Sequence, residues 1–129
     1  MTFFKIKYKL TSLFCLFVLI LSVMPSRNFP KVEVTCIDKI VHFLLYFSLV
    51  GAMFFDNIFC KNTTFQLKKL LFFLLFSIIF GAIIEIIQYF LPSRSAEWFD
   101  LLSNSLGAMF GVIVIFIVKR LILQKKSNL

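Results

Sequence analysis

The chain has 129 residues, of which 60% are hydrophobic, and a net charge of +8. Its mean hydropathy of +0.97 excludes a soluble domain of this size. In a soluble protein this charge would favour nucleic acid as a partner. Here the Lys and Arg residues flank apolar runs, where they set membrane topology and meet anionic lipid. We therefore expect an integral membrane protein with no nucleic-acid partner.

Four apolar runs predict four transmembrane helices within a single domain that covers residues 1–129, at residues 8–24, 37–55, 70–91 and 98–118. The first run follows three lysines but lacks an A-x-A-like cleavage site, so we predict an uncleaved helix rather than a signal peptide. Residues 56–66 are predicted as a polar loop. The break between the last two runs is short, which predicts an antiparallel hairpin. The expected fold is an all-α, up-down bundle.

The distribution of basic residues predicts the orientation of the four helices. Four spans place both termini and the loop around Lys61 on one side of the membrane, and that side carries ten of the 14 Lys and Arg residues. The opposite side carries the other four. By the positive-inside rule, both termini are cytoplasmic.

Polar residues gather at the outer ends of the last three helices. Carboxylates and amides inside a membrane helix are costly, so each needs a partner or a function. At 1.5 Å per residue, the deepest of them lie about 9 Å below the outer helix ends. The inner halves of all four helices are predicted to be purely apolar. We expect one outward-facing polar site, made of Asp38, His42, Glu85, Gln88, Arg94, Asp100 and Asn104.

Two of these residues lie one helical turn apart. His42 follows Asp38 at i+4, which is the spacing of a metal-binding pair or of an Asp-oriented general base. The alternative is a structural His that bonds to a helical neighbour or to the third helix. The sequence contains no recognised metal or cofactor motif, so we predict no cofactor. The three cysteines lack C-x-x-C spacing and predict no zinc site.

The remaining site residues also have two interpretations. Glu85 is either a functional carboxylate or the partner of Arg94 or Lys39 in an ion pair. Arg94 suits a phosphate or carboxylate head group, or forms a salt bridge to an acid of the fourth helix. Gly107 and Gly111 are spaced as in close helix packing, which we favour over any catalytic role.

Together these motifs resemble the VanZ-like family of bacterial membrane proteins. The matching residues are Asp38-Lys39-x-x-His42, Glu85-x-x-Gln88, Pro92-x-Arg94-Ser95 and Asp100-x-x-x-Asn104 with Gly107. Glu97 stands where the family more often has Asp. The resemblance implies a small multi-pass protein of the bacterial cytoplasmic membrane. Its namesake is associated with low-level resistance to teicoplanin, a lipid-bearing glycopeptide antibiotic.

Two classes of function follow from the polar site and the resemblance. The first is a protein that binds or modifies envelope lipid head groups or lipid-linked precursors, with teicoplanin tolerance as a consequence. The second is a membrane-embedded hydrolase that uses acid–base or metal-assisted chemistry. Membrane lipids or a lipid-linked envelope precursor are the expected partners. Whether the chain is an enzyme, and whether it forms a homo-oligomer, stays open at this point.

Overall fold

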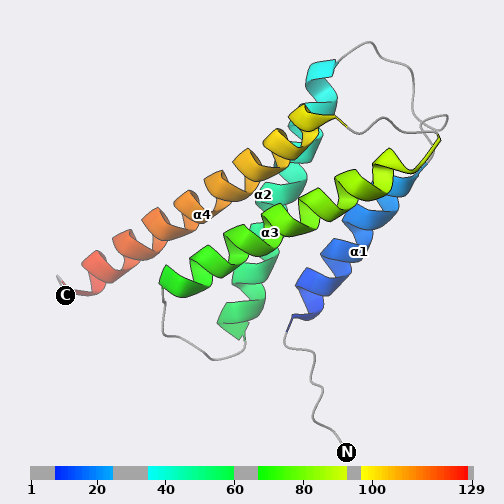
Figure 1. The fold of residues 1–129 in the computed structure, drawn as a ribbon. Coiled ribbons are helices and arrows are strands. Elements are labelled where there is room, and N and C mark those ends of the chain that lie inside the picture. The colour runs from blue at the N-terminus through cyan, green and yellow to red at the C-terminus, as the bar shows by residue number, and fades with distance from the viewer. Residues whose placement is uncertain (1–7, 25–34, 60–66, 93–96, 128–129) are drawn as a thin grey trace, which may run out of the picture.

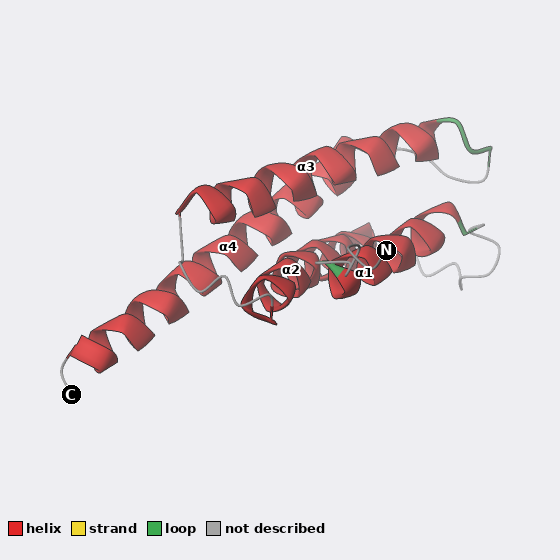
Figure 2. Ribbon diagram, turned by 90° about the horizontal axis from the view of Figure 1, so that it is seen from below, coloured by secondary structure: helices red, strands yellow, loops and turns green. Residues whose placement is uncertain are grey.

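The computed structural model describes residues 8–24, 35–59, 67–92 and 97–127, and these residues form four helices and no strand (Figure 2). The helices are α1 (Lys9–Val23), α2 (Thr35–Phe59), α3 (Leu67–Tyr89) and α4 (Trp98–Ser127). Consecutive helices run in opposite directions, so the end of α1, the start of α2, the end of α3 and the start of α4 lie at one end of the bundle (Figure 1). The predicted all-α, up-down membrane fold is confirmed.

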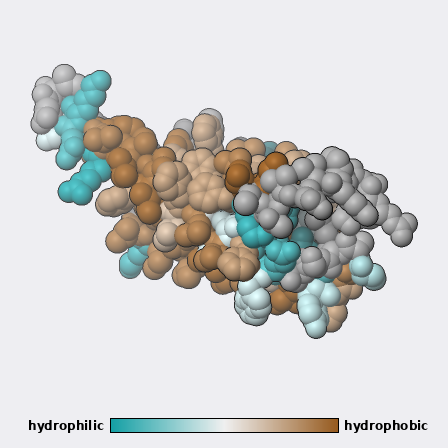
Figure 3. Space-filling view, turned by 90° about the horizontal axis from the view of Figure 1, so that it is seen from above, coloured by the Kyte–Doolittle hydropathy of each residue, from teal (hydrophilic) through white to brown (hydrophobic). Residues whose placement is uncertain are grey.

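The helices differ in their ability to cross a bilayer. Three of them, at Ile37–Ile58, Leu67–Tyr89 and Trp98–Lys125, are long and apolar enough to span. At 1.5 Å per residue, the 15 residues of α1 extend only about 22 Å, less than the roughly 30 Å of a hydrocarbon core. Brown apolar side chains cover the middle of the molecule, and teal polar side chains appear at the tip of α4 and beside the loops of the opposite end (Figure 3).

Two helices extend beyond their predicted spans, and one of these extensions has a structural cause. Helix α4 continues to Ser127, beyond the predicted end at residue 118, and α2 continues through Asp56 to Phe59 instead of ending in a loop. Asp56 is buried. Its carboxylate accepts hydrogen bonds from Leu10 N (3.3 Å), Thr11 N (2.8 Å) and Thr11 Oγ1 (2.8 Å) at the start of α1. The half of the bundle opposite the polar site is therefore not purely apolar, which corrects that prediction.

Helix α2 lies at the centre of the bundle and packs most extensively on α4. Glycines allow this approach, because a Cβ at Gly107 would collide with the carbonyl oxygen of Phe43. One at Gly111 would lie 3.1 Å from Val50 Cβ. Helix α1 packs on α2 and α3 and, over the described residues, makes no contact with α4. The position of α4 against α2 is therefore set by the contact of Gly107 with the backbone of Phe43.

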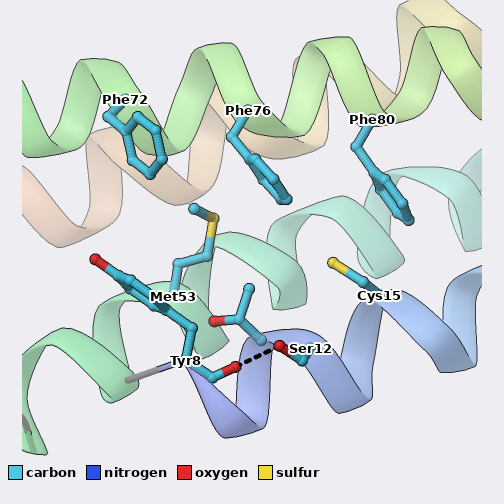
Figure 4. A pocket seen from close by; sticks show the side chains of 8 residues that line it. Tyr8, Ser12, Cys15, Met53, Phe72, Phe76 and Phe80 are labelled. Atoms are coloured by element: carbon cyan, nitrogen blue, oxygen red, sulfur yellow. Dashed lines mark hydrogen bonds between the residues drawn. The ribbon is translucent and has the colours of Figure 1, made fainter. Parts of the chain in front are cut away.

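A cavity of about 420 Å³ lies between α1 and α3. In Figure 4, Phe72, Phe76 and Phe80 of α3 point toward Met53 of α2 and toward the side chains of α1. The hydroxyl of Ser12, also on its wall, donates to a backbone carbonyl of its own helix. None of the lining residues belongs to the predicted polar site, so the cavity and that site are separate features.

Candidate functional site

The starts of α2 and α4 and the end of α3 bring the predicted polar residues to one end of the bundle (Figure 1). Five of these side chains are buried although they can all form hydrogen bonds. The exposed fractions are 9% for His42, 8% for Glu85, 3% for Gln88, 4% for Asp100 and 0% for Asn104. Asp38 is exposed. Burial of so many polar groups needs partners, because each unpaired group costs free energy.

His42 connects α2 to α4. Its Nδ1 lies 3.0 Å from Asn104 Oδ1, and its Nε2 lies 3.9 Å from Asp100 Oδ2. Since an amide oxygen only accepts, Nδ1 carries the proton and donates to Asn104. The expected alternative, in which His42 bonds within its helix or to α3, is replaced by this bond to α4.

The room for Asn104 comes from Gly81 of α3. A Cβ at Gly81 would lie 3.4 Å from Asn104 Nδ2 and 3.2 Å from Tyr46 Cε1. The amide nitrogen of Asn104 and the hydroxyl of Tyr46 are both buried without a hydrogen-bond partner among the described residues. In the sequence, Gly81 shares one helix face with Glu85 and Gln88. A glycine on this polar face is the signal that could have indicated the close approach of a polar residue from the neighbouring helix.

Lys39 provides the cation of this region. Its Nζ lies 3.2 Å from Glu97 Oε2 and 3.9 Å from Asp100 Oδ1. Sequence reasoning offered Lys39 as a partner for Glu85 and did not pair it with α4. Arg94, a predicted site residue, lies outside the described residues, so its contacts stay a prediction.

Glu85 is buried without compensation from the described part of the chain. Neither carboxylate oxygen has a hydrogen-bond partner there. The backbone N–H of Glu97 faces the carboxylate but falls short of hydrogen-bond geometry, and Asp100 is the largest source of like-charge repulsion on Glu85. The ion pair with Lys39 that the sequence allowed is not formed. Glu85 therefore adds a second acid to a region that already holds Asp100.

Gln88 points away from this cluster. Its Nε2 donates to the carbonyl oxygen of Ser22 at 3.1 Å, near the end of α1. Ser103 is also excluded from the cluster, because its hydroxyl donates to the Phe99 carbonyl at 2.8 Å. The structure thus joins Asp38, His42, Asp100 and Asn104, places Glu85 beside them, and uses Gln88 to attach α1.

Comparison with known proteins identifies the family of the chain. A comparison with curated proteins and with solved structures found no match. A family model described as VanZ/LLP1 matches residues 1–119, which includes three helices entirely and most of α4. The resemblance inferred from the polar motifs is confirmed, and the chain belongs to the VanZ/LLP1 family.

Proposed function

We propose that this protein binds the polar head group of an envelope lipid or lipid-linked precursor at the outer face of the bacterial cytoplasmic membrane. The supporting observation is the convergence of buried polar side chains from α2, α3 and α4 at one end of a bundle with an apolar exterior. The inner face is assigned to the opposite end by the excess of Lys and Arg there. The polar cluster then lies at the depth of the outer head groups.

The unpaired groups of the cluster support a ligand rather than a structural network. Two oxygens of Glu85, one of Asp100 and the amide nitrogen of Asn104 have no hydrogen-bond partner among the described residues. A purely structural network gains stability only when its members are satisfied. Hydroxyl and amine groups of a lipid head group offer donors to the carboxylates, and a hydroxyl or phosphate oxygen accepts from Asn104.

A hydrolase is the second candidate, and the geometry of His42 favours it. Asn104 holds the imidazole at Nδ1, as the orienting partner of a general base does, and Nε2, beside Asp100, is the nitrogen left to take a proton. Such an enzyme would add water to a bond of the bound lipid and release two products. His42→Gln would then abolish this conversion but leave lipid binding intact.

Native mass spectrometry in mild detergent tests the binding proposal. We expect wild type to retain a defined lipid, and a Glu85→Gln/Asp100→Asn variant to lose it. Ser103→Ala is the matched control, since this hydroxyl lies one residue from Asn104 and bonds only to its own helix. Equal retention of the same lipids in all three proteins would contradict a head-group site.

The same variants define the expected consequence in cells. Expression of wild type in a susceptible host should raise tolerance to teicoplanin, because a lipid-bearing antibiotic and the native lipid share the outer leaflet. The double variant should lose this tolerance at unchanged protein levels on an immunoblot. Tolerance that persists in the double variant would contradict a link between the polar site and the antibiotic.

A further inference from the structure

The side chains of Asp38, His42 and Asp100 each offer one ligand atom, and these atoms lie within 4.8 Å of one another. Two of them come from adjacent turns of α2, and the third comes from the first turn of α4. The ligand atoms of a tetrahedral metal site, with bonds of about 2.1 Å, are separated by roughly 3.4 Å. A small inward rotation of the side chains would therefore bring all three onto one ion.

The bond between His42 and Asn104 prepares the imidazole for this function. In the neutral imidazole whose Nδ1–H donates to Asn104 Oδ1 at 3.0 Å, Nε2 carries the lone pair and lies 3.9 Å from Asp100 Oδ2. A lone pair and a carboxylate oxygen are both acceptors, so they do not attract each other directly. A cation between them would satisfy both. Metal-binding histidines typically donate their other N–H to an oxygen in this way.

Burial gives a second, independent observation. Asp100 is only 4% exposed, and its Oδ1 has no hydrogen-bond partner among the described residues. Lys39 is 3.9 Å from that oxygen and makes its shorter contact, 3.2 Å, with Glu97. Glu85, 8% exposed and equally unpartnered over the described chain, adds further negative charge nearby. The region contains more buried acid than this lysine neutralises.

We propose that Asp38, His42 and Asp100 bind a divalent transition metal, Zn²⁺ or Mn²⁺, with Asn104 holding the imidazole from behind. Two carboxylates and one imidazole suit these ions. Three protein ligands leave a coordination position for water or for a phosphate oxygen. In this respect the metal site deepens the proposed head-group function, since the ion supplies the positive charge that a phosphate needs in an acidic site.

Equilibrium dialysis of the chelator-treated protein, in nanodiscs of phosphatidylcholine, against Zn²⁺ or Mn²⁺ tests the proposal. We expect about one ion per chain. Asn104→Ala should weaken binding by roughly 10- to 100-fold, as for other partners behind a ligand, and Asp100→Asn and His42→Gln should weaken it more. Ser103→Ala, the control, removes a hydroxyl that bonds within its own helix beside Asn104 and should bind like wild type.

Two further measurements make the result independent of folding defects. Pulsed EPR of bound Mn²⁺ should detect nitrogen coupling from His42 in wild type and none in His42→Gln. Lys39→Gln should bind the metal as tightly as wild type or more tightly. The site would be overturned by absence of stoichiometric binding or by unchanged binding in the ligand variants. It would also be overturned if Lys39→Gln bound the metal and wild type did not, and this result would assign Lys39 as the counter-ion of Asp100.

The proposed metal site and the proposed head-group function can be disproved separately. Metal binding is measured with no envelope lipid present, and lipid retention is measured by mass. Lipid retention without any metal binding contradicts the metal site alone. Metal binding without retention of a defined lipid contradicts the head-group function alone.

Discussion

The two ends of the bundle use the same residue type in opposite ways. At the predicted inner end, Asp56 accepts three hydrogen bonds from the start of α1, including the backbone N–H groups of Leu10 and Thr11. At the predicted outer end, Asp100 Oδ2 lies 3.9 Å from His42 Nε2, and Asp100 Oδ1 has no hydrogen-bond partner in the described part of the chain. Both carboxylates are buried.

The difference separates a structural acid from one that is available to a ligand. Asp56 satisfies N–H groups at a helix start, where the helix dipole also favours negative charge. Asp100 also lies in the first turn of its helix, yet its side chain turns toward α2. Burial alone therefore does not indicate function in this protein. The number of donors that each carboxylate finds is the better criterion.

Gly107→Ala should have the largest effect and should act on the outer end only. The added Cβ would meet the backbone of Phe43, which cannot move aside like a side chain, so we expect a loss of roughly 3 kcal/mol or more. The polar residues of α2 and α4 should move apart, while Asp56 still holds α1. Gly51→Ala is the control, because a Cβ there meets nothing within 4 Å. Denaturation in detergent measures both, and equal stability of the two variants would contradict the backbone contact.

The matched pair Asp56→Asn and Asp100→Asn tests the comparison directly. Asp56→Asn weakens the cap of α1 and should cost about 2 kcal/mol, near the upper value for a helix cap. Asp100→Asn removes a buried charge that the described residues only partly pair, so stability should change little while metal binding is lost. Thermal unfolding of each variant measures the contrast. Similar destabilisation in both would show that Asp100 is as structural as Asp56.

The sequence allowed the outer end to be predicted better than the inner end. Spans, hairpin and polar convergence follow from apolar run length and helical spacing, which depend on local sequence. The sequence predicts Asp56 in a loop, because an acid after an apolar run usually marks the end of that run. Its partners on α1 lie 45 and 46 residues away, and no local pattern indicates them.

Partners across helices were also hard to predict at the outer end. Helical spacing predicts that Gln88 lies on the same face of α3 as Glu85. In the structure, one part of that face packs against α4 and the part that carries Gln88 packs against α1. Only the packed arrangement shows that Gln88 reaches Ser22. In the same way, the sequence predicts a similar membrane depth for Lys39 and for several acids. The pairing of Lys39 with Glu97 depends on how α4 begins. Depth in the membrane is predictable from sequence, whereas rotation about a helix axis is set by packing.

Gln88→Met should have the smallest effect and should be confined to α1. Loss of the bond to the Ser22 carbonyl removes about 1 kcal/mol, because that carbonyl belongs to the last turn of α1. Ile86→Leu, at an exposed position of α3, is the control. Hydrogen exchange should increase near the end of α1 and remain unchanged in α4. Increased exchange around Asn104 would instead place Gln88 within the polar cluster.

The two tethers of α1 also predict how their losses combine. Asp56 holds the helix at Thr11 and Gln88 holds it at Ser22, about 17 Å apart at 1.5 Å per residue. Sites this distant without shared partners usually contribute additively. The double variant Asp56→Asn/Gln88→Met should therefore lose the sum of the two single effects, and metal binding at the outer cluster should survive in it. A double variant that loses the metal would mean that α1 supports the cluster, and the separation between the two ends of the molecule would no longer hold.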